Sequence, residues 1–143
     1  MVELSYQYLA GFIDGEGYVS IRKVKRGKYI EFKPMIVISN TNNLMLEQIK
    51  LFLNLKNKLA KRKMNCNHPK WKDSYHIYIS NVPCLSLCKN ILPFIIIKKE
   101  QVCNIIEFYN KPKPRGVKGI TKEEFDRRDK LVLSMNKLNK RGL

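Results

Sequence analysis

Hydrophobic and polar positions change their spacing along the chain, from helical periods to strand-like alternation and back. The first block has helical spacing from about Ser5 to Gly15, with Ser5 as the expected N-cap and glycines where helices commonly end. Alternation typical of strands follows over residues 18–26 and 29–39, which are separated by a turn at Gly27. The pattern predicts a helix followed by a β-hairpin.

The second of these strands has two distinct faces. Ile30, Phe32, Ile36 and Ile38 share one face, and Glu31, Lys33, Met35 and Val37 share the other. We expect the first face to be buried and the second to be available for contact.

The remaining blocks repeat this plan. The pattern predicts a helix over 42–53, a basic strand over 56–64, a polar loop over 65–73, a strand over 74–80 and helices over 83–92 and 98–109. Residues 111–116 are typical of a linker, and Thr121 is expected to begin a last helix with Glu124 as its capping-box partner. We therefore predict an α+β fold in the order αββαββα, with a four-stranded antiparallel sheet and C-terminal helices.

Length and charge narrow the class of protein. The 143 residues suffice for one domain, with a core over 1–110 and a basic linker and helical extension of the same domain over 111–143. The formal net charge of +16 fits a polyanionic partner, and the 44% hydrophobic content excludes a disordered basic tail. No targeting signal or membrane-spanning run is evident, so we expect a soluble, intracellular protein without a membrane partner.

Four cysteines are expected to remain reduced in such a protein. Cys84 and Cys88 lie one helical turn apart among apolar residues, which favours packing. Cys66 and His68 share a loop with His76 nearby, but without CxxC spacing they give only a weak zinc signal.

Basic residues concentrate on the predicted strands and their turns. Residues 56–72 contain seven lysines or arginines and no acid, and residues 22–33 contain six with only Glu31. Lysines also protect sheet edges, so a solvated surface remains an alternative. The concentration on one sheet favours binding in the major groove of DNA, whereas the aromatic signature of an RNA-binding sheet is lacking.

The segment from Leu9 to Gly17 joins an apolar helix to an acidic turn. Glu16 is expected just past the helix end, where unpaired carbonyls disfavour a carboxylate and attract a cation. Its carboxylate and the Gly15 carbonyl are oxygen ligands that suit Mg²⁺. The chemistry alone does not separate such a site from an exposed glutamate in a turn.

This segment resembles the LAGLIDADG motif. It matches at Leu9, Ala10, Gly11, Ile13, Asp14 and Gly17 and has conservative replacements at Phe12, Gly15 and Glu16. The order of elements, the basic sheet and Leu92-Pro93-Phe94 followed by Lys98 extend the resemblance to about residues 6–109. The chain is similar to homing endonucleases with a single motif.

The resemblance implies a homodimer in which two motif helices pack about a twofold axis. The implied interface residues are Leu9, Ala10, Gly11, Phe12 and Asp14, with Asp14 mainly supporting the helix end. Glu16 and Gly15 of each chain would hold a divalent metal, Mg²⁺ with Mn²⁺ as a substitute, beside the scissile phosphates. Lys98 would orient water or offset charge, and Asn40 would contact the water network. The chain departs from some relatives at Leu44, where they have a basic residue.

The implied function is cleavage of both strands of a long, nearly palindromic double-stranded DNA site by an intron-type homing endonuclease. The expected DNA contacts come from the sheet: Ser20, Arg22, Val24, Arg26, Glu31, Lys33, Met35, Lys58, Arg62, His76 and Tyr78. The alternatives are an RNA maturase of the same family, with intron RNA as partner, and a DNA-binding protein without nuclease activity. A basic ribosome-associated protein explains the charge but not the motif.

Overall fold

The computed structural model describes residues 3–56, 58–62, 73–110 and 120–140, and of Arg62 only the backbone. The first half contains α1 (Tyr6–Glu16), β1 (Gly17–Arg26), β2 (Tyr29–Asn40), α2 (Asn43–Phe52) and β3 (Ala60–Arg62). The second half contains β4 (Ser74–Ser80), α3 (Asn81–Ile91), α4 (Lys99–Tyr109) and α5 (Lys122–Leu138). The predicted α+β order is confirmed.

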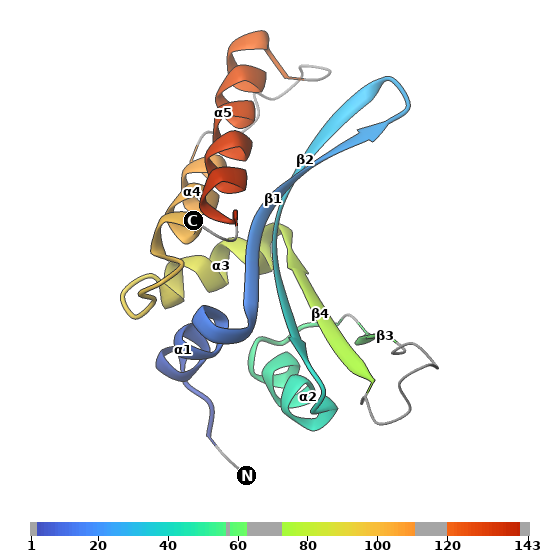
Figure 1. Ribbon diagram of the computed structural model, residues 1–143, viewed down its shortest axis with the longest axis vertical. Coiled ribbons are helices and arrows are strands. Elements are labelled where there is room, and N and C mark those ends of the chain that lie inside the picture. Colours follow the sequence, from blue (N-terminus) through green and yellow to red (C-terminus); the bar gives the residue numbers. More distant parts are fainter. Residues whose placement is uncertain (1–2, 57, 63–72, 111–119, 141–143) are drawn as a thin grey trace.

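The four strands form one antiparallel sheet in the order β1-β2-β4-β3. The helices pack on one face of this sheet, and α5 stands beside the long hairpin of β1 and β2 (Figure 1). The core lies between these layers and includes Val19, Ile36, Ile77, Leu87 and Ile105. Among the described residues no helix covers the second face of the sheet, which we call the open face.

Helix α1 follows from its caps and its apolar positions. The Ser5 hydroxyl accepts a hydrogen bond from the Tyr8 amide at 3.2 Å, as the sequence predicts. Leu9, Ala10 and Ile13 are fully buried in the core of their own chain. The sheet and the neighbouring helices of the same chain already cover Leu9 and Ala10, so their place in a dimer interface stays a prediction.

The hairpin of β1 and β2 extends beyond the rest of the sheet. Strand β4 pairs with β2 only from Met35 onward, so residues 21–34 pair only within the hairpin. We call residues 21–34 the arm. The expectation that Ile30 is buried is wrong: it is 40% exposed, because it lies near the tip of the arm and beyond the core.

One other element, the predicted basic strand, differs from the prediction. The basic strand expected over 56–64 shortens to Ala60–Arg62 within the described residues, and Lys58 precedes it in an irregular segment. Asn54 before it has a positive φ of 54°, which ends the α2 region abruptly. The predicted linker at 111–116 lies outside the described residues.

The last helix has the predicted cap but only half of the predicted capping box. The Thr121 hydroxyl accepts from the Glu124 amide at 3.2 Å. The Glu124 carboxylate does not complete the box; it accepts hydrogen bonds from Arg127 and Arg128 on the following turn.

In the part of the chain that the structure describes, no helix is long and apolar enough to cross a membrane.

Candidate active site and nucleic-acid face

The acidic turn lies where α1 passes directly into β1. Glu16 is the last residue of the helix, Gly17 is the first of the strand, and both Gly15 and Glu16 are exposed. A Cβ added to Gly17 would lie 2.8 Å from the Ile13 carbonyl oxygen, so this tight junction requires glycine. The junction holds the Glu16 carboxylate at the surface, at the negative end of the helix dipole.

Lys98 lies beside this junction, although it is far from it in sequence. Its Nζ donates to the carbonyl oxygens of Ile13 at 2.9 Å and Asp14 at 3.2 Å, and also to that of Gly17. An ammonium group has three donors, so these three bonds use its full capacity. The structure thus brings Lys98 to the predicted site but directs its charge at the end of α1.

Asp14 makes the reciprocal contact. Its carboxylate accepts hydrogen bonds from the amides of Ile96 at 2.9 Å, Ile97 at 3.1 Å and Lys98 at 3.0 Å. These amides precede α4, where free N–H groups and the positive end of the dipole favour an anion. We call the six hydrogen bonds between Asp14 and residues 96–98 and between Lys98 and α1 the clasp. Burial lowers the pKa of Lys98, against the opposing charges of Asp14 and Glu16.

Asn40 ends β2 and is partly buried. Its side-chain oxygen accepts from the Asn42 amide at 2.8 Å, and the Asn42 side chain in turn caps α2 through the Met45 amide at 3.2 Å. Asn40 therefore forms the turn into α2, the alternative that its sequence context also favours. Its amide nitrogen retains donors for other partners.

The open face of the sheet carries most of the predicted DNA contacts. Arg22, Arg26, Glu31 and Tyr78 are exposed, and Val24, Lys33 and His76 are partly buried. Lys58 is exposed outside the sheet, and the side chain of Arg62 lies outside the described residues. Ser20 and Met35 are only 7% and 5% exposed. They pair with each other at the crowded centre of the sheet, and their assignment as DNA contacts stays a prediction.

Polar contacts already organise part of this face. Arg26 Nε lies 2.6 Å from a carboxylate oxygen of Glu31, a cross-strand pair near the tip of the arm. His76 Nδ1 shares a hydrogen bond with the Ser39 hydroxyl on the neighbouring strand. Arg26 and Glu31 must therefore be considered together, since DNA contact by one changes the pairing of the other.

The described residues contain no group of three His, Cys, Asp or Glu side chains that could hold a metal. Cys66 and His68 lie outside these residues, so the weak zinc signal stays a prediction. Cys84 and Cys88 are buried, as predicted. One chain places a single carboxylate at the acidic turn, which is too few protein ligands for a closed metal site.

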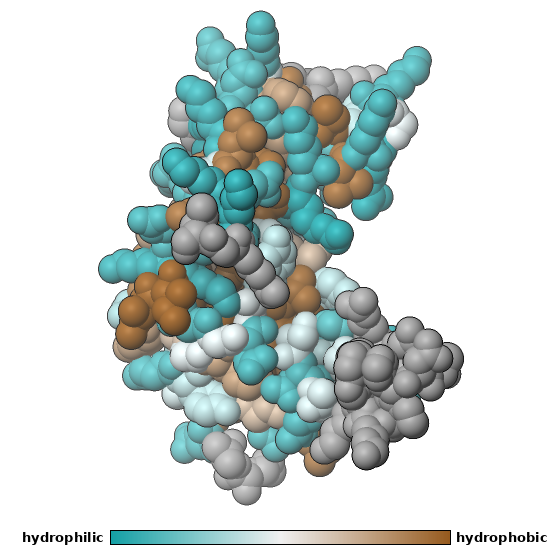
Figure 2. Space-filling view, viewed as in Figure 1, coloured by the Kyte–Doolittle hydropathy of each residue, from teal (hydrophilic) through white to brown (hydrophobic). Residues whose placement is uncertain are grey.

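An apolar surface beside the acidic turn was missed by the sequence reasoning. Phe94, Ile96 and Ile97 are 40%, 80% and 73% exposed on the loop between α3 and α4. Figure 2 shows a hydrophobic patch where Figure 1 places this loop, on the side of the molecule where α1 lies. The three successive isoleucines at 95–97 were a usable signal, because only Ile95 is buried. Tyr8 on α1 is also exposed, at 48%.

Comparison with known proteins agrees with this geometry. A family model described as LAGLIDADG endonuclease matches residues 9–95, more than half of the chain. No curated protein sequence matches closely enough to count as a relative.

Solved structures share the fold. The homing endonuclease I-CvuI, in complex with its target, is 17% identical with a TM-score of 0.68, over 96% of this chain and 83% of that one. The archaeal intron-encoded homing endonuclease I-Vdi141I, complexed with DNA, is 21% identical with a TM-score of 0.72, over 96% and 86%. The LAGLIDADG homing endonuclease I-GzeII, also with a DNA target, is 19% identical with a TM-score of 0.61, over 99% of this chain but 46% of that one. With its motif at the junction of α1 and β1, the chain belongs to the LAGLIDADG endonuclease family.

Proposed function

We propose that the chain is a site-specific DNA endonuclease that acts as a homodimer and hydrolyses both strands with the help of a divalent metal. The observation that carries this proposal is the single exposed carboxylate of Glu16 at the end of α1, next to an open basic sheet face. One such carboxylate per chain becomes a pair when two copies meet. A dimer with twofold symmetry would recognise a nearly palindromic target.

The residues at the turn fit a hard divalent cation such as Mg²⁺, with Mn²⁺ as a substitute. Glu16 supplies an exposed carboxylate and Gly15 a backbone carbonyl at a helix end, and DNA phosphates would supply further oxygen ligands. A bound metal supplies activation of water and stabilisation of the leaving oxygen. Lys98 binds the carbonyls of residues 13, 14 and 17, which flank Gly15 in sequence. These hydrogen bonds fix the backbone around Gly15.

The surface of α1 supports dimerisation. Tyr8, Gly11, Phe12 and Gly15 lie on one face of the helix, and a Cβ added to either glycine would meet nothing within 4 Å. Exposed helical glycines cost up to about 1 kcal/mol each relative to alanine without a compensating contact. A second helix packed closely against this face would supply that contact. The exposed Ile96 and Ile97 adjoin this surface through their bonds to Asp14.

The open sheet face is the proposed DNA surface. Arg22 and Lys33 are directly paired across β1 and β2, and they project from the face that none of the described helices covers. Lysine and arginine contacts to phosphates supply affinity, and arginine can also read guanine. The formal net charge of +16 predicts steep weakening of binding as salt rises.

A selection experiment tests the activity and identifies the target sequence at the same time. A plasmid pool with random inserts is incubated with the purified protein in Mg²⁺ or in EDTA, and linear products are sequenced. We expect linear products with one recurring, nearly palindromic site in Mg²⁺ and none in EDTA. Sequence-specific binding without cleavage in Mg²⁺ or Mn²⁺ would contradict the nuclease and favour a binding protein or a maturase.

A further inference from the structure

The arm, residues 21–34, lacks the support that the rest of the sheet has. Strand β4 pairs with β2 only over Met35–Asn40, so within the described part of the chain the arm consists of two strands with no third strand beside them. Two-stranded hairpins are marginally stable in water on their own. The orientation of the arm must therefore depend on contacts outside the sheet.

Helix α5 supplies these contacts. Lys23 and Phe32 are directly paired across the arm and point toward α5. Lys23 Nζ lies 2.7 Å from Asp129 Oδ1, and the rings of Phe32 and Phe125 meet edge to face with centroids 5.2 Å apart. The Lys23 ammonium also lies 5.3 Å from the centre of the Phe125 ring. Figure 1 shows α5 alongside the hairpin over this region.

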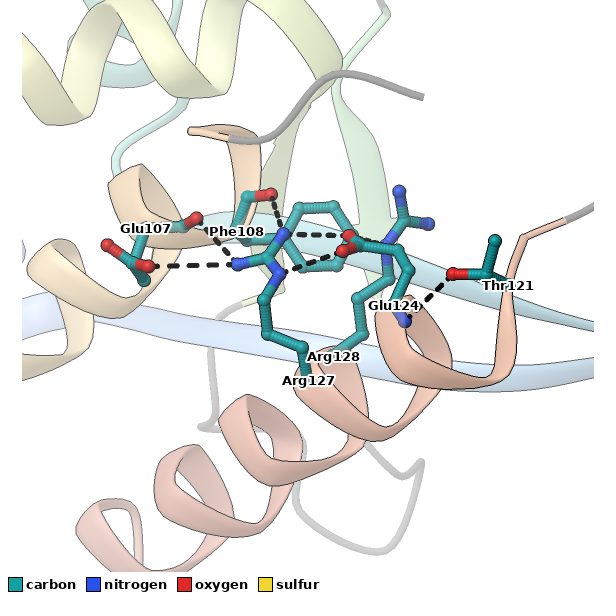
Figure 3. Close-up of polar contacts among 6 residues, drawn as sticks. All are labelled: Glu107, Phe108, Thr121, Glu124, Arg127 and Arg128. Atoms are coloured by element: carbon teal, nitrogen blue, oxygen red, sulfur yellow. Dashed lines mark hydrogen bonds and ion pairs between the residues drawn. The ribbon is translucent and has the colours of Figure 1, made fainter. Parts of the chain in front are cut away.

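Helix α5 is itself fixed to α4 by residues next to Phe125 and Asp129. The Arg127 guanidinium donates to the carbonyl oxygens of Glu107 and Phe108, each at 3.0 Å, at the C-terminal end of α4 (Figure 3). The Glu124 carboxylate holds this guanidinium in place at 2.7 Å. Arg128 lies 4.7 Å from the centre of the Phe108 ring. We call these contacts of residues 124, 127 and 128 the clip.

The other end of α5 is tied to the base of the hairpin. Asn139 Nδ2 donates to the carbonyl oxygen of Val19 at 2.9 Å, on the outer edge of β1. Val132 and Met135 between the two ends are buried in the core. The helix is thus held to the core along its length. Contacts with it can therefore fix the orientation of the arm relative to the core.

We propose that α5 is a brace that sets the orientation of the arm, with Phe125 and Asp129 as positioning residues for contacts to the outer part of the DNA target. The DNA part of this inference rests on the proposed function. Arg26 is nine strand positions from Gly17, or roughly 30 Å at about 3.3 Å per residue. That length corresponds to about nine base pairs of duplex from the acidic turn.

A rigid arm favours binding because its cations need not be ordered on contact. The exposed face of the arm carries Arg22, Arg26 and Lys33, opposite the face that packs on α5. A hairpin that is free to swing would lose conformational entropy when these side chains meet phosphates. Bracing removes part of that cost before DNA binds.

The test compares Phe125→Ala and Asp129→Asn with Asp126→Asn. Asp126 is an exposed acid on the same helix, so it controls for the loss of one negative charge. Amide hydrogen exchange in the free proteins reports on the arm. Affinity is measured in EDTA for the selected target and for the same duplex shortened to its central half.

We expect exchange in residues 22–33 to be faster by at least about tenfold in Phe125→Ala, since an aromatic contact is lost. In Asp129→Asn we expect about threefold, since the lost ion pair is partly exposed. Affinity for the full target should fall by about tenfold in Phe125→Ala and stay unchanged for the shortened duplex, with Asp126→Asn like wild type in exchange.

Unchanged exchange in the arm would overturn the brace. Faster exchange with unchanged affinity, or an equal loss on both duplexes, would overturn its role toward the outer target. If Phe125→Ala does not fold, the matched pair Asp129→Asn and Asp126→Asn still decides the question. The exchange measurement needs no DNA, so it distinguishes failure of the brace from failure of the nuclease.

Discussion

Asp14 and Lys98 link two helix ends: the charge of Asp14 lies at the start of α4, and that of Lys98 lies at the end of α1. The carboxylate of Asp14 satisfies amides before α4, and the ammonium of Lys98 satisfies carbonyls at the end of α1. Each charge also has the sign that the neighbouring helix dipole favours. The clasp therefore fixes the position of the acidic turn relative to the core.

Lys98→Met should loosen this turn. The change removes three hydrogen bonds from a charged donor, a cost of about 2 kcal/mol in the free energy of unfolding. DNA cleavage should fall by at least tenfold, while affinity for the target changes little. Lys99→Met, at the exposed neighbouring lysine, serves as the control in urea unfolding and cleavage assays. Full stability in Lys98→Met would contradict the role of the clasp.

The sequence predicted the members of the site better than their contacts. The motif places Glu16 and Gly15, and the resemblance selects Lys98 from 28 basic residues. That the Lys98 ammonium binds carbonyls depends on how α4 docks on α1, which no local pattern specifies. The low exposure of Ser20 and Met35 was not predicted for a related reason: alternation identifies the face of a strand but not the crowding at its centre.

At the scale of elements, the clip joins α5 to α4 through the Arg127 guanidinium, which the Glu124 carboxylate holds in place. Hydrogen bonds from Arg127 and then Arg128 hold the pKa of Glu124 at about 2, against the opposing effect of burial. Because this pKa lies below its ordinary value of 4.5, the stabilisation is complete above about pH 4.5. It is lost progressively as the pH falls toward 2.

Glu124→Gln should remove this pH dependence from α5. Wild type should lose more stability than the variant between pH 4.5 and 2, with a difference on the order of 3 kcal/mol at most. The measurement is urea unfolding at several pH values between 4.5 and 2, with circular dichroism as the signal. Glu123→Gln, at an exposed acid on the same turn, should keep the wild-type slope. Equal slopes in wild type and Glu124→Gln would show that the clip contributes nothing.

The elements themselves were largely predictable from periodicity and caps. Ser5 and Thr121 cap their helices as expected, because an N-cap depends on residues within one turn. The second half of the capping box failed because Arg127 and Arg128 lie three and four residues after Glu124 and compete for its carboxylate. The prediction that the basic strand begins at residue 56 was wrong, because the length of an edge strand depends on its partner more than on its own sequence.

At the scale of the whole molecule, Gly11 and Gly15 of α1 have open space where a side chain would lie. An alanine at Gly11 meets nothing in the structure, whereas an alanine at Gly17 would collide with Ile13. The two positions therefore separate the needs of the fold from those of assembly. The sequence alone could not make this distinction, since both glycines belong to one motif.

Gly11→Ala should stabilise the isolated chain by up to about 1 kcal/mol through helix propensity. It should weaken the dimer by at least tenfold, because the added methyl group would hold two closely packed helices apart. Sedimentation equilibrium measures the dimer constant, and denaturation of the dilute monomer measures stability. Gly17→Ala should instead destabilise the chain itself. A dimer of unchanged strength in Gly11→Ala would place the interface elsewhere.

The central claim is that Glu16 of each chain acts in hydrolysis and is not needed for recognition. The most direct measurement compares wild type, Glu16→Gln and the exposed control Glu47→Gln on the selected target, with cleavage in Mg²⁺ and affinity in EDTA. We predict linear product from wild type and Glu47→Gln, and none from Glu16→Gln, which should bind with wild-type affinity. Cleavage by Glu16→Gln at the wild-type rate would contradict the claim.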